Sequence, residues 1–343
     1  MTMTRPCRPL ARALFATLGT AMIGAAAAGD APLPDLVLRD GFERAESADI
    51  RPLSDEFSNA ATLGDWRRLW REEYWLRDPL DALDIGAALD GWITFVPATS
   101  TWYEDYVGEL AFKAVAGDFV ASTRVRARAR DGTGAPGSTH GGSVASEFSL
   151  AGILVRAPHA DVACCDPSWW QAGAERYVFL SFGAADQPGS YQLEAKTTRA
   201  AVAPETHSVS NLELASAQGE EAELRVARIG GAMLLLVREP GDAWRVHRRY
   251  RRDDFPLTLQ VGMTVYTDWA IASSYPYLEH NRTHIVHAWN DAGTPGDPDL
   301  RAGFDWFRFV RPQVPAALAG RDLADPGDVG DAELLAFLGD AVP

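Results

Sequence analysis

Short apolar runs separated by turn residues dominate the chain from residue 93 to residue 312. Some runs are rich in β-branched and aromatic residues and others alternate between apolar and polar, which is typical of strands joined by turns. They lie at residues 93–97, 109–115, 118–130, 148–156, 176–183, 191–197, 222–229, 232–239, 257–267 and 304–312. Long helical segments do not alternate with these runs, which argues against a parallel α/β sheet. The pattern predicts an all-β protein with two sheets packed face to face.

The run at residues 118–130 alternates most clearly. One set of alternate positions holds Phe119, Ala121, Thr123, Val125, Ala127 and Ala129, and the other set includes Arg124, Arg126, Arg128 and Arg130. Because successive side chains of a strand point to opposite faces, the arginines form a row on one face of the sheet. We expect that face to be solvated or paired with acids.

The first 28 residues have the features of a cleavable export signal. Arg5, Arg8 and Arg12 precede an apolar stretch of small residues, and AAAAGDA offers a cleavage site near Ala28. The alternative is a membrane anchor, which needs about 20 apolar residues, whereas this stretch has roughly 16. Residues 1–28 are therefore predicted to be a signal peptide of a bacterial protein that is secreted or periplasmic. The acidic, proline-containing residues 29–53 are predicted to be a linker or extended arm.

The chain is acidic, with a net charge of −15 that becomes −18 when the three arginines of the signal are removed. This charge argues against nucleic acid and anionic membranes as partners. No other stretch is long and apolar enough for a membrane span in the mature chain. The roughly 315 residues that remain after cleavage are long enough for one large sandwich or two small domains. Residues 54–312 are predicted to form the sandwich. In the tail, residues 313–343, DAELLAFLGD predicts a short helix that starts at Asp331 and stops at Gly339.

Several segments carry a family resemblance. They are DEFSNAATLGDWRRL (55–69), LDGWITFVPATSTWYEDYVGELAFKAVAGDFVASTRV (89–125), AGILVR (151–156), ERYVFLSFG (175–183), AELRVARIGGAMLLLV (222–237), VGMTVYTD (261–268) and FDWFRFVRP (304–312). Together they resemble the concanavalin A-like jelly-roll domains of unknown function that stand alone or are appended to secreted bacterial glycoside hydrolases. The resemblance implies an all-β, two-sheet jelly-roll sandwich, here with a short C-terminal helix. The resemblance does not identify functional residues, because the matching positions are mostly core positions.

The sequence contains no recognisable catalytic motif. The E-x-D-x-x-E strand of laminarinases, which places the acid and the nucleophile of a glycosidase on one face, does not occur. The strands that alginate lyases of this fold use and a G-x-S-x-G nucleophile elbow are not found either. The acids Glu220, Glu221 and Glu223 follow a turn and are predicted to be solvated. We therefore predict no catalytic residue.

Aromatic residues outside the strands are the candidate ligand contacts. Sugar-binding surfaces use aromatic rings that stack on the apolar side of a pyranose, with polar groups around them that bond its hydroxyls. The candidates are Trp102, Tyr103 and Asp105, beside Glu104 and Tyr106, in a first group, Trp169 and Trp170 in a second, and Asp268, Trp269, Tyr275, Tyr277, His280, His284 and Trp289 in a third. The alternative for each group is core packing or the anchoring of a loop.

Cys164 and Cys165 are the only cysteines that remain after cleavage of the signal. In an oxidising compartment they are expected to form a disulfide between adjacent residues, which would stiffen the loop beside Trp169 and Trp170. The alternative is a pair of reduced, buried thiols.

Three histidines, His280, His284 and His287, lie close together in the sequence and raise the question of zinc. Pro276 and Asn290 around them favour an irregular loop. We expect these histidines to anchor the loop or to hydrogen-bond a ligand, and we predict neither a metal site nor a cofactor.

The leading hypothesis is a secreted, non-catalytic carbohydrate- or cell-surface-binding protein whose partner is a polysaccharide or another glycan. One alternative is a glycoside hydrolase or polysaccharide lyase with a diverged site that uses acids such as Glu104, Asp105 or Asp268. The other is a structural envelope protein.

Overall fold

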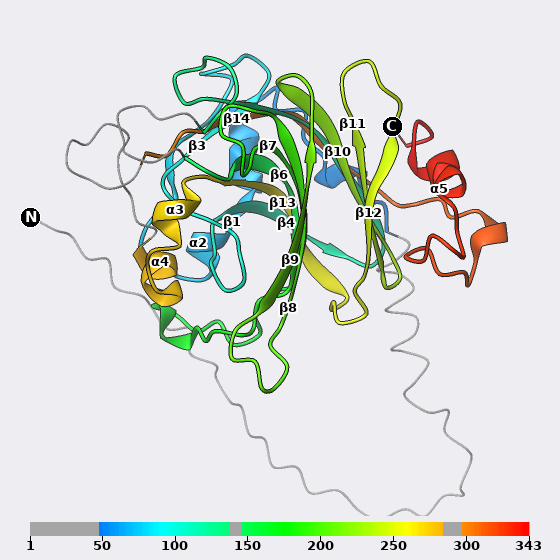
Figure 1. Ribbon diagram of the computed structural model, residues 1–343. Helices are drawn as coiled ribbons and strands as arrows, with labels where there is room; N and C mark the ends of the chain where they lie inside the picture. Colours follow the sequence, from blue (N-terminus) through cyan, green and yellow to red (C-terminus); the bar gives the residue numbers. More distant parts are fainter. Residues whose placement is uncertain (1–47, 138–145, 284–296, 343) are drawn as a thin grey trace, which may run out of the picture. The chain divides into compact units, whose positions relative to one another are not determined.

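The structure is a computed structural model that describes residues 48–137, 146–283 and 297–342. Its strands form two seven-stranded sheets in which neighbouring strands run antiparallel (Figure 1). Sheet I contains, in spatial order, β1 (Arg67–Arg68), β4 (Glu109–Ala116), β13 (Thr258–Tyr266), β6 (Ser149–Arg156), β7 (Tyr177–Ala184), β8 (Gln192–Arg199) and β9 (Val209–Ser216). Sheet II contains β12 (Arg245–Arg251), β11 (Ala232–Arg238), β10 (Glu221–Ile229), β5 (Phe119–Arg128), β14 (Arg301–Val310), β3 (Ile93–Pro97) and β2 (Leu80–Ile85). The predicted two-sheet jelly-roll sandwich is confirmed.

The helices are short and lie outside the sheets. They are α2 (Leu69–Glu72), α3 (Trp269–Ala272), α4 (Tyr277–Thr283) and α5 (Asp331–Leu338), with 3₁₀ turns at Arg51–Leu53, Ala60–Asp65, Pro167–Trp169 and Ala316–Leu318. None of the helices in the described residues is long and apolar enough to span a membrane. The short C-terminal helix is confirmed as α5, which is followed by Gly339 as predicted. The side chain of Glu333 caps its first turn by accepting a hydrogen bond from the Gly330 backbone N–H.

The core lies between the two sheets. On β5 the apolar positions Phe119, Ala121 and Val125 point into it, as the alternation predicts. The opposite face of β5 carries the arginine row, and the arginines pair with acids: Arg124 and Arg126 bind Glu221, at 2.8 and 2.6 Å. The last residues before the sandwich also take part, because Ile50 is buried in the same core. The rest of the predicted signal and arm, residues 1–47, lies outside the described residues.

The strands that the sequence did not predict are the edge strands. β1 and β9 border sheet I, and β2 and β12 border sheet II. Edge strands are partly solvated, and β12 (RVHRRYR) and β9 (VSNLELAS) accordingly carry polar residues on both faces. Their sequences therefore lack the apolar alternation that marks a half-buried strand.

The C-terminal tail covers the outer face of sheet II. Leu318, Leu334 and Phe337 pack with Leu236 of β11 and with Trp244, which directly precedes β12, in a second apolar cluster. Figure 1 shows α5 beside β12. The tail is therefore part of the fold and buries apolar surface that the sandwich alone would expose.

The buried Arg225 of β10 ties the tail to the sheet. Its guanidinium donates to the carbonyl oxygen of Leu338 and, at 2.6 Å, to that of Gly339, and it lies 4.2 Å from the centre of the Trp244 ring. Carbonyl oxygens at the end of a helix have no partner within the helix, so the arginine satisfies them. Burial lowers the pKa of Arg225 to about 10, which leaves it charged at neutral pH.

We predict that Phe337→Ala lowers the free energy of unfolding by about 2 to 4 kcal/mol, because a buried aromatic side chain is lost and a cavity remains. Urea unfolding followed by tryptophan fluorescence measures this. Ala336→Ser, at an exposed position of the same helix, should change stability by about 0.5 kcal/mol or less. Equal stability of Phe337→Ala and the wild type would show that the tail is not part of the cooperative fold.

Candidate functional site

Sheet I is apolar on both faces. One face forms the core with sheet II, and the other carries Phe112, Tyr177, Phe179 and Tyr266 in a third apolar cluster. All eight residues of β6 and all eight of β7 are accordingly buried. We call the second face the covered face, because the segment 98–108 and helix α2 lie over it. The candidate site lies where this cover ends.

Trp102 is the main contact between the cover and the sheet. It is fully buried, its ring lies 5.3 Å from that of Tyr177, and its Nε1–H donates to the carbonyl oxygen of Glu109 at 3.1 Å. Asp105 is also fully buried, and its carboxylate accepts the backbone N–H groups of Gly173 and Ser208 at 2.9 and 3.0 Å. Both residues were predicted as ligand contacts. Their burial leaves no surface for a ligand, so they support the site and are not part of it.

A cavity of about 230 Å³ opens beside Trp102. It is lined by Thr101, Tyr103, Phe148, Lys196, Leu212 and Trp269. Tyr103 from the first predicted group and Trp269 from the third meet here, with ring centres 5.2 Å apart and planes at 70°. Phe148 adds a third ring, 6.1 Å from Trp269. The fold thus joins two of the three predicted groups at one cavity.

Lys196 lines the cavity, and other groups of the protein bind its ammonium group. Its ammonium donates to the carbonyl oxygen of Trp102 at 2.6 Å, lies 2.8 Å from a carboxylate oxygen of Glu194, and lies 5.1 Å from the centre of the Tyr103 ring. The other oxygen of Glu194 accepts from the hydroxyl of Tyr266 at 2.8 Å. Burial lowers the pKa of Lys196. Because Glu194 compensates its charge, the cavity offers mostly ring faces and few polar groups.

The sequence did not reveal Lys196, Phe148 or Leu212 as site residues. One signal was available: Glu194 and Lys196 are two residues apart on a strand, so they share a face, and only one other lysine, Lys113, is present in the chain. Phe148 opens a predicted strand and Leu212 lies on the unpredicted edge strand β9, and only the fold brings them to the cavity.

Helix α4 forms one flank of the site, where an irregular loop was predicted. The irregular loop was predicted for residues 279–291, and this prediction was wrong for residues 279–283, which belong to α4. Tyr277 packs on Tyr106 with ring centres 4.4 Å apart, and its hydroxyl hydrogen-bonds the carboxylate of Glu104. Burial and the charge of Glu104 raise the pKa of Tyr277. The hydroxyl of Tyr106 in turn donates to the carbonyl oxygen of Tyr275 at 2.8 Å. Tyr275, a predicted ligand contact, is therefore held in this flank through its backbone.

Two further predicted contacts of the third group, His280 and Asp268, are buried. Nε2 of His280 accepts the N–H of Thr101 at 3.3 Å, and burial lowers its pKa to about 4, so it is neutral at pH 7. Asp268 accepts from Thr99 Oγ1 at 2.6 Å and from the N–H of Asp297 at 3.0 Å, and burial raises its pKa to about 6. Both side chains hold the loops that carry Thr101 and Trp269.

The burial of Asp105 and Asp268 also bears on the hydrolase and lyase alternative. Neither acid reaches a ligand, and Glu104 is engaged by Tyr277, so these three acids do not form an exposed acid and base pair. His284, His287 and Trp289 lie outside the described residues. In the described ranges, no group of three or more His, Cys, Asp or Glu residues could hold a metal ion.

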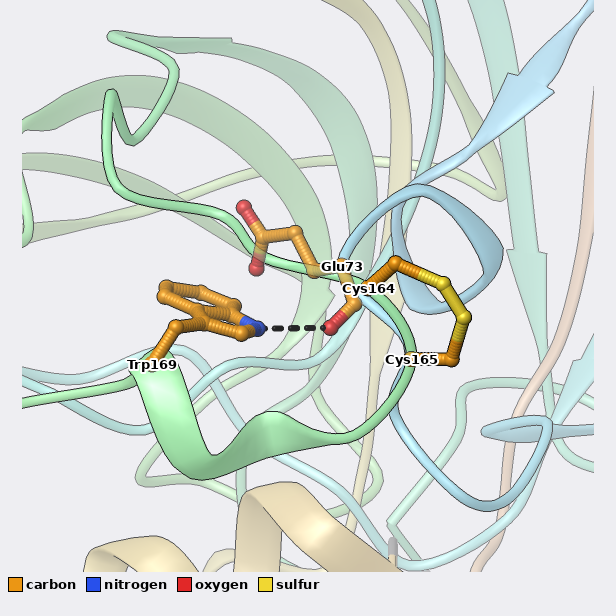
Figure 2. Close-up of a disulfide and its surroundings, with 4 residues drawn as sticks. All are labelled: Glu73, Cys164, Cys165 and Trp169. Atoms are coloured by element: carbon orange, nitrogen blue, oxygen red, sulfur yellow. Dashed lines mark hydrogen bonds between the residues drawn. A yellow bond between two sulfur atoms is a disulfide. The ribbon is translucent and has the colours of Figure 1, made fainter. Parts of the chain in front are cut away.

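The second predicted group lies apart from the cavity. Trp169 and Trp170 pack on the buried Trp75, with ring centres 5.6 and 6.3 Å away, and the Trp169 Nε1–H donates to the carbonyl oxygen of Glu73 at 3.1 Å. Figure 2 shows this hydrogen bond beside the disulfide that joins Cys164 and Cys165. Both cysteines are exposed. The two tryptophans are half-buried and anchor the loop that presents the disulfide.

We predict that the exported protein contains this disulfide between Cys164 and Cys165. Peptide mapping of protein that is denatured without reductant should find neither cysteine alkylated, because both sulfurs are bonded. Reduction should then add about 2 Da before alkylation and allow both to react. Alkylation without reductant would identify the pair as free thiols.

We also predict a pH effect that arises from His280. Its pKa is about 4 in the folded protein against 6.5 as the ordinary value, so the unfolded chain binds more protons between these pH values. Stability should therefore fall as the pH drops from 6.5 to 4. His280→Gln keeps an acceptor for the Thr101 N–H and removes the titration, so its slope should be smaller by up to about 1.4 kcal/mol per pH unit.

Urea unfolding at a series of pH values tests this. A slope remains in the variant, because burial also lowers the pKa of His247 to about 4, and the raised pKa of Asp268 acts in the opposite direction. Only the difference between the two slopes reports on His280. Identical slopes for wild type and His280→Gln would contradict the prediction.

Comparisons with known proteins give a likeness in fold. No protein-family model and no curated protein matches the chain. Among solved structures, it is similar to a functionally unknown protein from Saccharomyces cerevisiae, at 15% identity and a TM-score of 0.41 over 73% of this chain and 98% of that chain. It is also similar to the GH43 protein BlXynB from Bacillus licheniformis, at 13% identity and a TM-score of 0.42, over 75% of this chain and 39% of that chain. A third is the kappa-carrageenase of Pseudoalteromonas carrageenovora in complex with an oligosaccharide of kappa-carrageenan, at 10% identity and a TM-score of 0.41 over 75% and 92% of the two chains. At these identities no residue role transfers to this chain.

Proposed function

We propose that this protein is an exported, non-catalytic carbohydrate-binding protein that receives one sugar residue in the cavity beside Trp102. The observation that carries the proposal is the set of three aromatic rings, Tyr103, Phe148 and Trp269, around a cavity of about 230 Å³. Ring faces pack against the C–H groups of a pyranose, and the hydroxyls of the sugar need a few polar partners at the rim. Thr101 and Lys196 are the polar residues among those that line the cavity, but each is only 2% exposed, so the three rings provide most of the contact area.

The size and polarity of the cavity favour a single ring. Pockets for drug-sized ligands usually exceed about 300 Å³, so this one suits a terminal sugar or one residue of a chain. The charge of Lys196 is compensated by Glu194, so the cavity itself favours a neutral ring. The predicted export signal supports the proposal, because an exported protein can meet a soluble glycan or a cell-surface polysaccharide.

We predict that Trp269→Ala weakens glycan binding at least about ten-fold, which corresponds to about 1.4 kcal/mol. A glycan array identifies the ligand, and calorimetry measures the affinity. Trp306→Ala is the matched control, because Trp306 is a half-buried tryptophan on the outer face of sheet II, where it contacts Arg308; it should bind like the wild type.

A second variant protects the test against misfolding. Leu212→Trp, on the edge strand β9, fills the cavity without removing a core contact, so it should block binding while its circular dichroism stays unchanged. If the wild type binds no glycan, or if both cavity variants bind as well as it does, the proposal is wrong.

A further inference from the structure

Arginine side chains without a polar partner are few among the described residues, and three of the four lie in two adjoining segments. Among the described residues, the side chains of Arg71, Arg77, Arg282 and Arg301 form neither a hydrogen bond nor an ion pair, whereas the side chains of other arginines bind acids or carbonyl oxygens. The guanidinium of Arg71 lies 5.1 Å from the centre of the Trp70 ring. Arg301 is on β14 of sheet II. The other three belong to two segments that touch each other, beside the covered face of sheet I.

Backbone hydrogen bonds bring these segments together. The chain turns tightly after α2, with the N–H of Trp75 on the carbonyl oxygen of Trp70 at 2.9 Å, and the N–H of Leu76 then donates to the carbonyl oxygen of Arg282 in α4 at 3.1 Å. Arg77 directly follows Leu76, so residues some 200 positions apart in the sequence become neighbours. All three arginines are exposed.

Exposed apolar side chains lie among these arginines. Tyr74, Leu76 and Leu278 are exposed by 36, 53 and 42%, and Leu278 is one helical turn before Arg282, so the two share a face of α4. We call this surface the arginine surface; its residues are Arg71, Tyr74, Leu76, Arg77, Leu278 and Arg282. Side chains of this mixed kind suit a ligand that presents both apolar ring faces and negative charge.

The acids around the arginine surface are already engaged. Glu72 binds Arg67, Asp78 binds Arg68, and the buried Glu73 binds Arg156. Glu279, which is exposed on α4, also has an interaction partner. Asp166 is a further acid, and the charge of Arg282 is among the causes that lower its pKa, after its hydrogen bonds with Ser168. The surface is therefore positive on a chain whose net charge is −15.

Helix α4 carries Leu278 and Arg282 of the arginine surface, and the same helix contacts the aromatic residues beside the cavity. Tyr277 of this helix packs on Tyr106, Tyr106 lies 6.1 Å from Trp269, and Trp269 lines the cavity.

From this arrangement we propose that the ligand is an anionic glycan, whose carboxylate or sulfate groups pair with Arg71, Arg77 and Arg282 while one of its rings occupies the cavity. The proposal rests on the proposed function. The planar guanidinium group binds carboxylates and sulfates through two parallel hydrogen bonds, and exposed pairs of this kind give selectivity more than affinity.

The test compares polygalacturonate, dextran sulfate and neutral dextran as ligands of the full protein. At least one polyanion should bind more tightly than dextran, and its affinity should fall as salt is added. Arg77→Gln and Arg282→Gln should each weaken binding of that polyanion about three-fold, and the double variant about ten-fold, as expected for two exposed ion pairs. Arg301→Gln removes the same charge from the other sheet and should bind like the wild type.

The outcomes separate this proposal from the proposed function. Preference for polygalacturonate identifies carboxylates, and preference for dextran sulfate identifies sulfate esters; either supports the proposal. It is overturned if the arginine variants bind like the wild type while Trp269→Ala loses binding, a result that leaves the proposed function intact. It is also overturned if dextran binds as tightly as both polyanions, or if vesicles of phosphatidylserine bind and neither polyanion does.

Discussion

The structure depends on the need to cover the second face of sheet I. In a two-sheet sandwich each sheet buries one face against the other, and the remaining faces commonly meet water. Here that remaining face carries Phe112, Tyr177, Phe179 and Tyr266, and exposing these rings would cost several kcal/mol. The segment 98–108 therefore folds back onto the sheet through Trp102. The cavity lies at the end of this cover, so the site follows from the same apolar face that shapes the fold.

Buried ion pairs fix the positions of the segments that surround the covered face of sheet I. Arg156, on β6, binds Glu175 at 2.7 Å and Glu73 at 2.6 Å, and Arg68 binds Glu109 at 2.6 Å. Burial alone would raise the pKa of Glu175, but the charges of Arg156 and His159 lower it. Buried pairs of this kind add little net stability compared with apolar contacts, but breaking one leaves an unpaired buried charge. Their contribution is to fix which segments meet, and through Glu73 they position the turn that bears Tyr74 and Leu76.

Prediction from the sequence succeeded for segments whose residue pattern occurs in only one kind of environment. The central strands were found because their apolar positions face the core, whereas β2, β9 and β12 were missed because an edge strand is partly solvated. In the site, Tyr103 and Trp269 were named from the sequence and line the cavity. Trp102 and Asp105 were named for the same reason but are buried, since an aromatic or acidic residue outside a strand can serve a ligand or anchor a loop equally well.

The sequence by itself determined the two-sheet sandwich and its short terminal helix, because periodicity and turn residues are local properties that the chain carries in order. Tertiary structure alone decided which aromatic residues are accessible, that Lys196 is compensated by Glu194, and that Arg77 lies beside Arg282. These features depend on contacts between segments far apart in the chain, and side-chain burial and charge pairing arise only when such segments meet. The same amino acids could otherwise have been core, anchor or surface.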